Sequence, residues 1–415
     1  MIKLFLFYLL TALYYNSYRY ILKINNARTS PTYSDTPSWL SGGKYIIILF
    51  IFCLILSLLA MRKKKNNYSN NPTVFSAKNK KHATYVMFFL AFYFYSIVIT
   101  GITSDFYAFE ATFFFPIFIF ILLGDFDRHA FFNKVFNFLK ASVWIFLIVD
   151  IIQYLLFYFF NRLPALAYEG SVSVRFGSLQ DDPNGYAFLM SSFYFVGMYY
   201  RGIARFMFYS LFVVNLLLTI SFTGMAAVLL AIAIVTLLSS KLTFNKLILY
   251  WSSLVVAVAG VIVISQLPLV QKIISTKQGS IDQHANLFSA LTGIGVSDVF
   301  GFNPVGWIAE SAYVNILLNF GVIVTCVIYF LVASILYSYI RYLTKVKPDY
   351  NRLKKEPVYI LGLCAFSFSL SIFIGGVNLP LEVVFPVNAL FPFFLSLLCI
   401  IPSYRYALDN AYQSE

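Results

Sequence analysis

The chain has 415 residues, of which 60% are hydrophobic and 11% are charged. Soluble domains average about 45–50% apolar and about 25% charged residues, so this composition excludes a water-soluble globular protein. The formal net charge of +13 does not indicate nucleic acid, because Lys and Arg form short clusters between apolar runs, a pattern typical of membrane orientation.

Apolar runs of membrane-spanning length recur along the whole chain. Each crossing needs about 20 residues, so the sequence predicts an all-α polytopic membrane protein with about 12 transmembrane helices in one integral domain, residues 1–415. The first run is followed by Tyr14, Tyr15 and Asn16 where a cleavage site would need small residues, so we expect an uncleaved first span. The predicted spans are residues 2–22, 44–61, 83–101, 108–124, 138–160, 184–200, 206–222, 224–240, 247–266, 312–340, 358–377 and 384–402.

The basic cluster Arg62–Lys65 sets the predicted orientation. Cytoplasmic loops carry an excess of Lys and Arg, so this cluster is expected in the cytoplasm together with both termini. A tight turn at Thr223-Gly224 is expected between the seventh and eighth spans. No cytoplasmic segment is long enough to fold into a domain that binds a soluble nucleotide. The two longest outer loops, residues 161–183 and 267–311, are the candidate sites of chemistry.

The first outer loop combines a cation with a predicted helix start. Asp182 followed by Pro183 fits an N-cap with proline at the first helical position. Helix N-termini attract anions, and the guanidinium of nearby Arg175 is suited to bidentate phosphate contact. A structural alternative is that Arg175 pairs with a neighbouring carboxylate or with lipid headgroups.

The second outer loop offers two candidate proton-transfer groups. Ser280–Gln283 forms a capping box that predicts a short helix, on which His284 shares a face with apolar residues. A lone histidine on such a face is usually a packing residue, but His284 is the one histidine expected outside and titrates near neutral pH. Glu310 is expected at the outer end of the next span, where a carboxylate caps the helix, pairs or takes part in chemistry.

Two acidic features elsewhere are assigned no catalytic role. Asp150 lies within an apolar run, where it either holds the fold through a hydrogen bond or lies beneath a substrate cavity, and the structural role is favoured. Asp125-Phe126-Asp127 matches the DxD pattern of some glycosyltransferases, but it is expected in the cytoplasm without a supporting domain. The cysteine spacing supports neither a disulfide framework nor a zinc site, and no cofactor or metal is predicted.

A family resemblance covers about residues 170–340. The chain resembles bacterial O-antigen polymerases of the Wzy type, within a superfamily that includes O-antigen ligases. The segments that resemble the family are Arg175–Ser178, Asp182–Asn184, Leu218–Gly224 and Glu310–Asn315 followed by Gly321.

The resemblance implies a fold of the membrane glycosyltransferase class (GT-C-like) in the bacterial inner membrane, with its active site at the periplasmic face. Such enzymes join repeat units carried on undecaprenyl diphosphate, which serve as donor and acceptor. Arg175 and Asn184 match the diphosphate-binding segment. The second loop has no Arg and offers Lys272, Lys277 or His284 instead, and Lys277 is our choice.

The base for the attacking hydroxyl is predicted to be Glu310, with His284 second. Ligases have a His-Asn pair where this chain has Glu310-Ser311, which favours a polymerase. The alternatives are a ligase and a lipid-linked oligosaccharide flippase or transporter; the lack of a visible internal repeat argues against a carrier. Besides the lipid-linked glycan, the resemblance implies membrane lipid, a flippase and a chain-length regulator as partners, and no nucleic acid.

Overall fold

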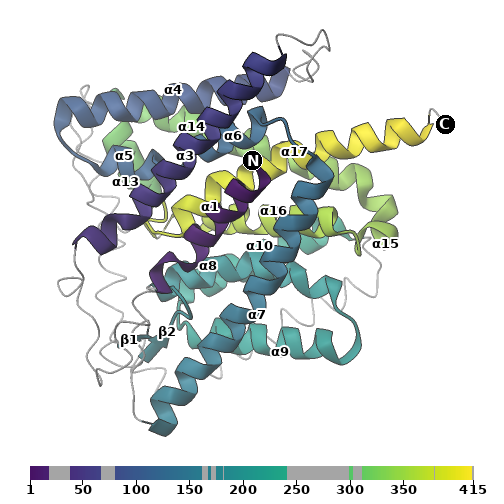
Figure 1. The fold of residues 1–415 in the computed structure, drawn as a ribbon. Coiled ribbons are helices and arrows are strands. Elements are labelled where there is room, and N and C mark those ends of the chain that lie inside the picture. The colour runs from purple at the N-terminus through teal and green to yellow at the C-terminus, as the bar shows by residue number, and fades with distance from the viewer. Residues whose placement is uncertain are drawn as a thin grey trace.

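The computed structural model describes residues 1–17, 38–66, 80–160, 167–169, 174–180, 182–240, 299–301, 311–377 and 379–413. These ranges are almost entirely helical (Figure 1). The helices are α1 Ile2–Tyr14, η1 Tyr15–Ser17, α3 Ser38–Asn66, α4 Lys80–Thr103, α5 Tyr107–Thr112, α6 Pro116–Leu123, α7 Arg128–Phe160, α8 Pro183–Tyr194, η4 Phe195–Tyr199, α9 Gly202–Leu218, α10 Phe222–Ser239, α13 Ala312–Phe320, α14 Val322–Val346, η7 Lys347–Asp349, α15 Tyr350–Leu353, α16 Pro357–Gly375 and α17 Val387–Gln413.

Seven of the described helices are long and apolar enough to cross a membrane. Many large apolar side chains on the helix surfaces are open to the surroundings, among them Ile203, Phe206 and Phe330, each more than 70% exposed. Such surfaces need a lipid solvent, so the chain is a multi-pass membrane protein. The seven apolar stretches are Gly42–Met61, Lys81–Thr103, Arg128–Phe160, Phe222–Ser239, Val322–Leu353, Pro357–Gly375 and Val387–Arg405.

Two predicted spans are broken in the structure. The span predicted at 108–124 is split into α5 and α6, because Pro116 has no N–H to continue the first helix and instead begins the second. The span predicted at 312–340 is split at Gly321, whose φ of +80° reverses the chain between α13 and α14. Thr325 then donates a hydrogen bond to the carbonyl of Ile316, at 3.2 Å, across this reversal.

Other predicted spans are shorter than expected. The first continues only as η1 to Ser17, with residues 18–22 outside the described part. The span predicted at 184–200 is α8 followed by the 3-10 helix η4. The span predicted at 247–266 lies outside the described residues. Twelve continuous transmembrane helices are therefore not found in the described part of the chain.

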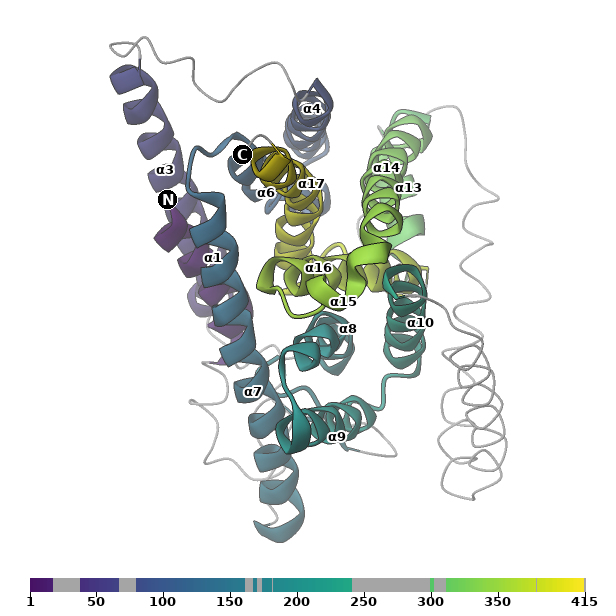
Figure 2. The same ribbon diagram turned by 90° about the vertical axis from the view of Figure 1, so that its right-hand side faces the viewer.

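Helix α16 lies at the centre of the bundle, in contact with α8, α10, α14 and α17 (Figure 2). In α16 and α17, 78% of the apolar stretch is buried, against 22% in α3. Small residues allow this close packing, as expected for membrane helices. A Cβ atom on Gly375 would lie 2.2 Å from Phe188 of α8, and Ser371 and Ser191 join the same two helices through a 2.9 Å hydrogen bond.

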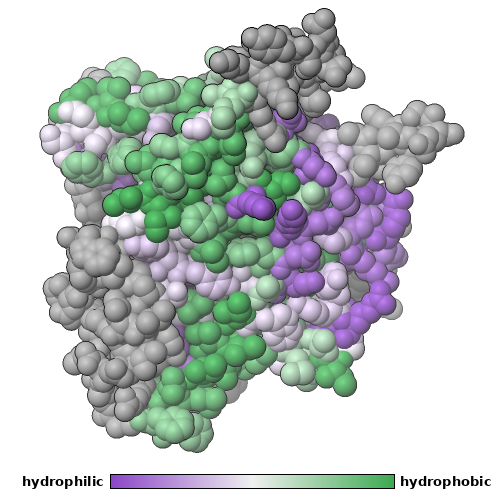
Figure 3. Space-filling view, viewed as in Figure 1, coloured by the Kyte–Doolittle hydropathy of each residue, from purple (hydrophilic) through white to green (hydrophobic). Residues whose placement is uncertain are grey.

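The bundle has two chemically different ends. One, which we call the basic end, holds the start of α7, the end of α14, α15 and the start of α16, with Arg128, Arg341, Arg352 and Lys354. Figure 3 shows hydrophilic residues gathered on this side, on the right, and hydrophobic residues over α3 and α4. We call the opposite end, where α8 begins and α16 ends, the distal end. Helices α1 and α17 begin and end the chain toward the basic end (Figure 1).

Candidate functional site

Arg175 lies on a two-stranded hairpin at the distal end, which the all-α prediction did not include. Strand β1 (Ala167–Glu169) pairs antiparallel with β2 (Val174–Phe176), with Tyr168 opposite Arg175. Successive side chains of a strand point to opposite faces. Phe176 packs against the rings of Tyr154 and Phe157 on α7, so Arg175 is directed to the other side, toward α8 and α9.

The guanidinium of Arg175 joins three segments of the distal end. Its Nε donates to the carbonyl oxygen of Thr219, at 2.9 Å, and its Nη2 donates to Oδ1 of Asn184, at 2.7 Å. The same Asn184 oxygen accepts a 2.7 Å hydrogen bond from Ser221. We call Arg175, Asn184, Thr219 and Ser221 the Arg175 cluster. Hydrogen bonds to a charged donor fix the plane of the guanidinium and give Arg175 a structural role.

The start of α8 agrees with the sequence prediction. Asp182 is the N-cap, and its carboxylate accepts from the backbone N–H groups of Asn184, at 2.9 Å, and Gly185, at 3.1 Å. Pro183 stands at the first helical position. The Asp182 carboxylate therefore occupies N–H groups that an anion would otherwise use, and any anion-binding strength here must come mainly from Arg175.

The turn between α9 and α10 lies earlier than predicted. Helix α9 ends at Leu218 and α10 begins at Phe222, so Thr223-Gly224 belongs to the first turn of α10. Ser221 caps α10, and Ile220 has a φ of +45° in the connection. This reversal brings the Thr219 carbonyl and the Ser221 hydroxyl to Arg175 and Asn184, which the expected turn would not do.

Asp150 supports the segment that follows β2. Its Oδ1 accepts a 3.1 Å hydrogen bond from the backbone N–H of Ser178, and Gln153 donates to the carbonyl of the same residue, at 2.5 Å. Ser178 has a left-handed φ of +53°, and its hydroxyl donates to the carbonyl of Phe146, at 2.6 Å. These contacts agree with the predicted structural role of Asp150.

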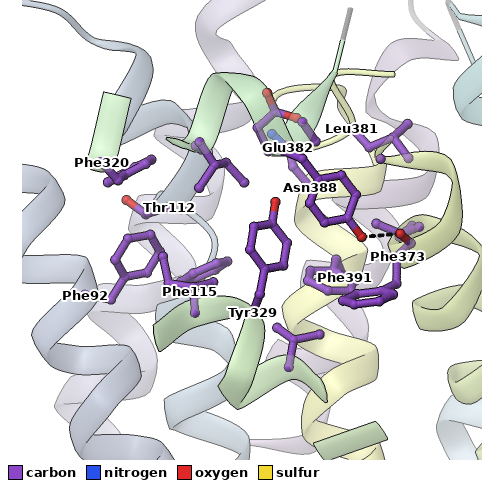
Figure 4. A pocket seen from close by; sticks show the side chains of 18 residues that line it. Phe92, Thr112, Phe115, Phe320, Tyr329, Phe373, Leu381, Glu382, Asn388 and Phe391 are labelled. Atoms are coloured by element: carbon purple, nitrogen blue, oxygen red, sulfur yellow. Dashed lines mark hydrogen bonds between the residues drawn. The ribbon is translucent and has the colours of Figure 1, made fainter. Parts of the chain in front are cut away.

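A second polar group, which sequence reasoning missed, lines a cavity of about 80 Å³ at the distal end (Figure 4). Glu382, in the 379–386 segment between α16 and α17, accepts a hydrogen bond from Tyr107 and another from Asn315, at 3.2 Å. Both bonds use Oε1, and Oε2 is fully buried with no hydrogen-bond partner among the described residues. Burial raises the pKa of Glu382 to about 7, against the effect of the hydrogen bonds from Tyr107 and Asn315.

Asn388, in the first turn of α17, lines the same cavity. The residue is 5% exposed, and in the described part of the chain neither its Oδ1 nor its Nδ2 has a hydrogen-bond partner. In Figure 4, Glu382 and Asn388 lie together at one end of the cavity, and the ring of Tyr329 points toward them. We call Glu382, Asn388 and the space beside them the Glu382 cavity.

The segments that carry the Arg175 cluster and Glu382 are in contact. A Cβ atom on Gly185, one residue after Asn184, would lie 3.3 Å from Cγ1 of Val384, two residues after Glu382. Backbone hydrogen bonds from Ala312 to the carbonyls of Gly376, at 2.9 Å, and Leu379, at 3.1 Å, bring the start of α13 to the same place. The ends of α8, α13, α16 and α17 thus build one surface.

The remaining predicted site residues Glu310, His284 and Lys277 lie outside the described residues, as does Lys272. Ser311, immediately after Glu310, caps α13 and donates a 3.3 Å hydrogen bond to the carbonyl of Gly376. At the opposite end, Asp127 of the DxD pattern accepts from the backbone N–H of Ala130, at 3.1 Å, at the start of α7. This contact gives Asp127 a structural role at the start of the helix.

No known protein family and no curated protein matches the chain.

Proposed function

We propose that this protein joins undecaprenyl-diphosphate-linked oligosaccharide units, as an O-antigen polymerase of the Wzy type with a GT-C-like fold. The proposal places it in the bacterial inner membrane, with the distal end in the periplasm and the basic end and both termini in the cytoplasm. The concentration of described basic residues at one end supports this orientation.

The main support is the position of Arg175. It is a cation at the end opposite the basic cluster, where the positive-inside rule does not favour one. Its guanidinium is oriented by Thr219 and Asn184 beside the start of α8. A cation oriented in advance stabilises charge that develops on a leaving group without further reorganisation.

The residues at the distal end suit glycosyl transfer from a lipid-linked diphosphate. The diphosphate is already an activated leaving group, so no ATP or soluble nucleotide is needed on the periplasmic side. Arg175 and Asn184 hold the donor diphosphate, with Lys277 as the predicted cation of the second loop. The sequence prediction gives the base role to Glu310 or His284.

A ligase is the nearest alternative, and Glu310-Ser311 in place of its His-Asn pair argues against it. A carrier such as a flippase usually binds cargo near the middle of the membrane. The Arg175 cluster and the Glu382 cavity instead lie where helices begin and end, which favours surface chemistry over transport.

Deletion of the gene tests the proposal in the source cell. The glycan ladder of repeat units should collapse to a single unit, and the undecaprenyl-diphosphate-linked unit should accumulate. Restoration by the wild-type gene is the control. A ladder that persists unchanged would reject the polymerase, and full-length polymer that stays on its lipid carrier would indicate a ligase.

A further inference from the structure

The Glu382 cavity is a small, mainly apolar space with polar atoms at one end. Helices α4, α5, α13, α14, α16 and α17, the α5–α6 connection and the 379–386 segment surround it. Its volume of about 80 Å³ holds a hydroxyl group with its carbon, or about two water molecules, but no complete sugar ring. Seven of its lining residues are aromatic: Phe92, Phe115, Tyr313, Phe320, Tyr329, Phe373 and Phe391.

Three buried polar atoms of this cavity have no partner within the described structure. They are Oε2 of Glu382 and both Oδ1 and Nδ2 of Asn388. Leaving a buried polar group unsatisfied is unfavourable, so such groups normally meet a ligand or water. A ligand in this cavity must accept a hydrogen bond from Nδ2 of Asn388 and donate one to Oδ1 of Asn388 or Oε2 of Glu382.

A hydroxyl group meets these demands better than an ion. A phosphate would face the carboxylate of Glu382, which repels it. A hard cation takes about six oxygen ligands, whereas the described residues that line this cavity offer two fully buried side-chain oxygens without a partner, Glu382 Oε2 and Asn388 Oδ1. A hydroxyl both donates and accepts, and its carbon fits the apolar wall.

The position of the cavity in the fold indicates which hydroxyl group of the substrate it would bind. The contact between Gly185 and Val384 joins the segment that carries Glu382 to the start of α8, which carries Asn184 of the Arg175 cluster, where the proposed function puts the donor diphosphate. We propose that the Glu382 cavity receives the attacking hydroxyl of the acceptor glycan, and that Oε2 of Glu382 accepts its proton. This inference rests on the proposed function and replaces Glu310 and His284 as the base.

The step balances in bonds and charge. The acceptor O–H bond breaks and its proton moves to Oε2 of Glu382. The acceptor oxygen forms a bond to the anomeric carbon of the donor glycan, while the bond from that carbon to the diphosphate oxygen breaks. The electron pair leaves with the diphosphate beside Arg175. Asn388 positions the hydroxyl through Nδ2.

The test uses purified full-length protein in liposomes that contain lipid-linked repeat units. Glu382→Gln keeps the size of the side chain and the acceptor for Tyr107 but removes the base. We expect the initial rate of linkage to fall by about 100-fold or more, a typical contribution of a general base, with retention of labelled lipid-linked unit unchanged. Glu110→Gln, on α5 outside the cavity, is the matched control and should keep the wild-type rate.

Asn388→Leu is a second, independent test of the hydroxyl-binding role, and it replaces Glu382→Gln if that variant fails to accumulate in the membrane. Removing both amide atoms at similar volume should raise the apparent KM for the lipid-linked unit. A wild-type rate in either variant would overturn the inference, and a wild-type rate in Asn388→Leu with a higher Tm would show that the cavity holds only water. If Glu382→Gln lost the rate of linkage and the retention of labelled lipid-linked unit to the same extent, the inference would also be overturned, because binding and not proton transfer would be affected. If wild-type protein links nothing, the proposed function fails first.

Discussion

Gly185, in the first turn of α8, packs directly against Val384 in the segment between α16 and α17. A Cβ atom on Gly185 would lie 3.3 Å from Val384 Cγ1 and 3.8 Å from Val387 Cγ2. A larger side chain at position 185 must therefore displace α8 or the 379–386 segment. Because this segment carries Glu382, the contact couples the Arg175 cluster to the Glu382 cavity.

Gly185→Leu should lower the rate of linkage while the protein still inserts. Overpacking typically costs about 1–3 kcal/mol, and here the displacement would separate the donor and acceptor groups. Gly101→Leu, on α4 with no atom within 4 Å of its Cβ position, is the matched control. The measurement is the glycan ladder, normalised to protein in the membrane. Equal ladders from the two variants would contradict the coupling.

Arg175→Ala should abolish chain growth, and Arg175→Lys should restore little of it. Lysine keeps the charge but lacks the planar fork that reaches both Thr219 and Asn184. Arg201→Ala, exposed at the basic end, controls for loss of a positive charge. Ladder length and membrane protein are measured together. Normal ladders in Arg175→Ala would remove Arg175 from the mechanism.

Asp150 should matter for stability rather than for chemistry. Asp150→Asn keeps an acceptor for the backbone N–H of Ser178, whereas Asp150→Leu leaves that buried group unpaired, at about 1–3 kcal/mol. We expect Asp150→Leu to lower the Tm in detergent and Asp150→Asn to change it little. Loss of activity in Asp150→Asn at an unchanged Tm would assign Asp150 a chemical role instead.

The ionisation of Glu382 predicts how stability depends on pH. A carboxyl group with a raised pKa binds its proton more tightly in the folded state, so ionisation destabilises the fold. The stability contributed by the protonated form is present below the ordinary pKa of 4.5 and is lost as pH rises to about 7. Glu382→Gln should therefore show a higher Tm than wild type at pH 8 and no such difference at pH 4.5. A lower Tm at pH 8 would contradict this.

The rate of linkage should rise with pH through about 7, because the base is the carboxylate. The groups that face Glu382 are Tyr107, which donates to it, and Tyr329. Nearby, the negative charge of Glu110 disfavours ionisation of Tyr107. The Nζ atom of Lys44 lies 4.6 Å from the centre of the Phe385 ring. Glu110→Gln should keep the rise in rate. Glu382→Gln should give a flat, low profile, and a profile identical to wild type would show that another group titrates.

Hydropathy and capping signals predicted the local features of this chain well. The apolar runs gave the positions of α3, α4, α10, α16 and most of α17, and Asp182-Pro183 gave the start of α8. Both signals depend on residues that are close in sequence. The breaks at Pro116 and Gly321 were missed because both residues sit within runs that remain apolar throughout.

The candidate site was only partly predictable for the same reason. Arg175 and Asn184 belong to one short segment and were identified together, but their contacts to Thr219 and Ser221 depend on a turn about 40 residues away whose position was misjudged. One sequence feature could have identified Glu382: it is a carboxylate between two apolar runs. Its importance comes from burial against Tyr107 and Asn315, which no local pattern shows.

The most direct measurement of the central claim is linkage by the purified protein alone, reconstituted in liposomes with undecaprenyl-diphosphate-linked repeat units. The account predicts glycans longer than one unit, released free diphosphate lipid in equal number to the new linkages, and no requirement for ATP. Movement of the units across the bilayer without any new linkage would contradict it and identify a carrier.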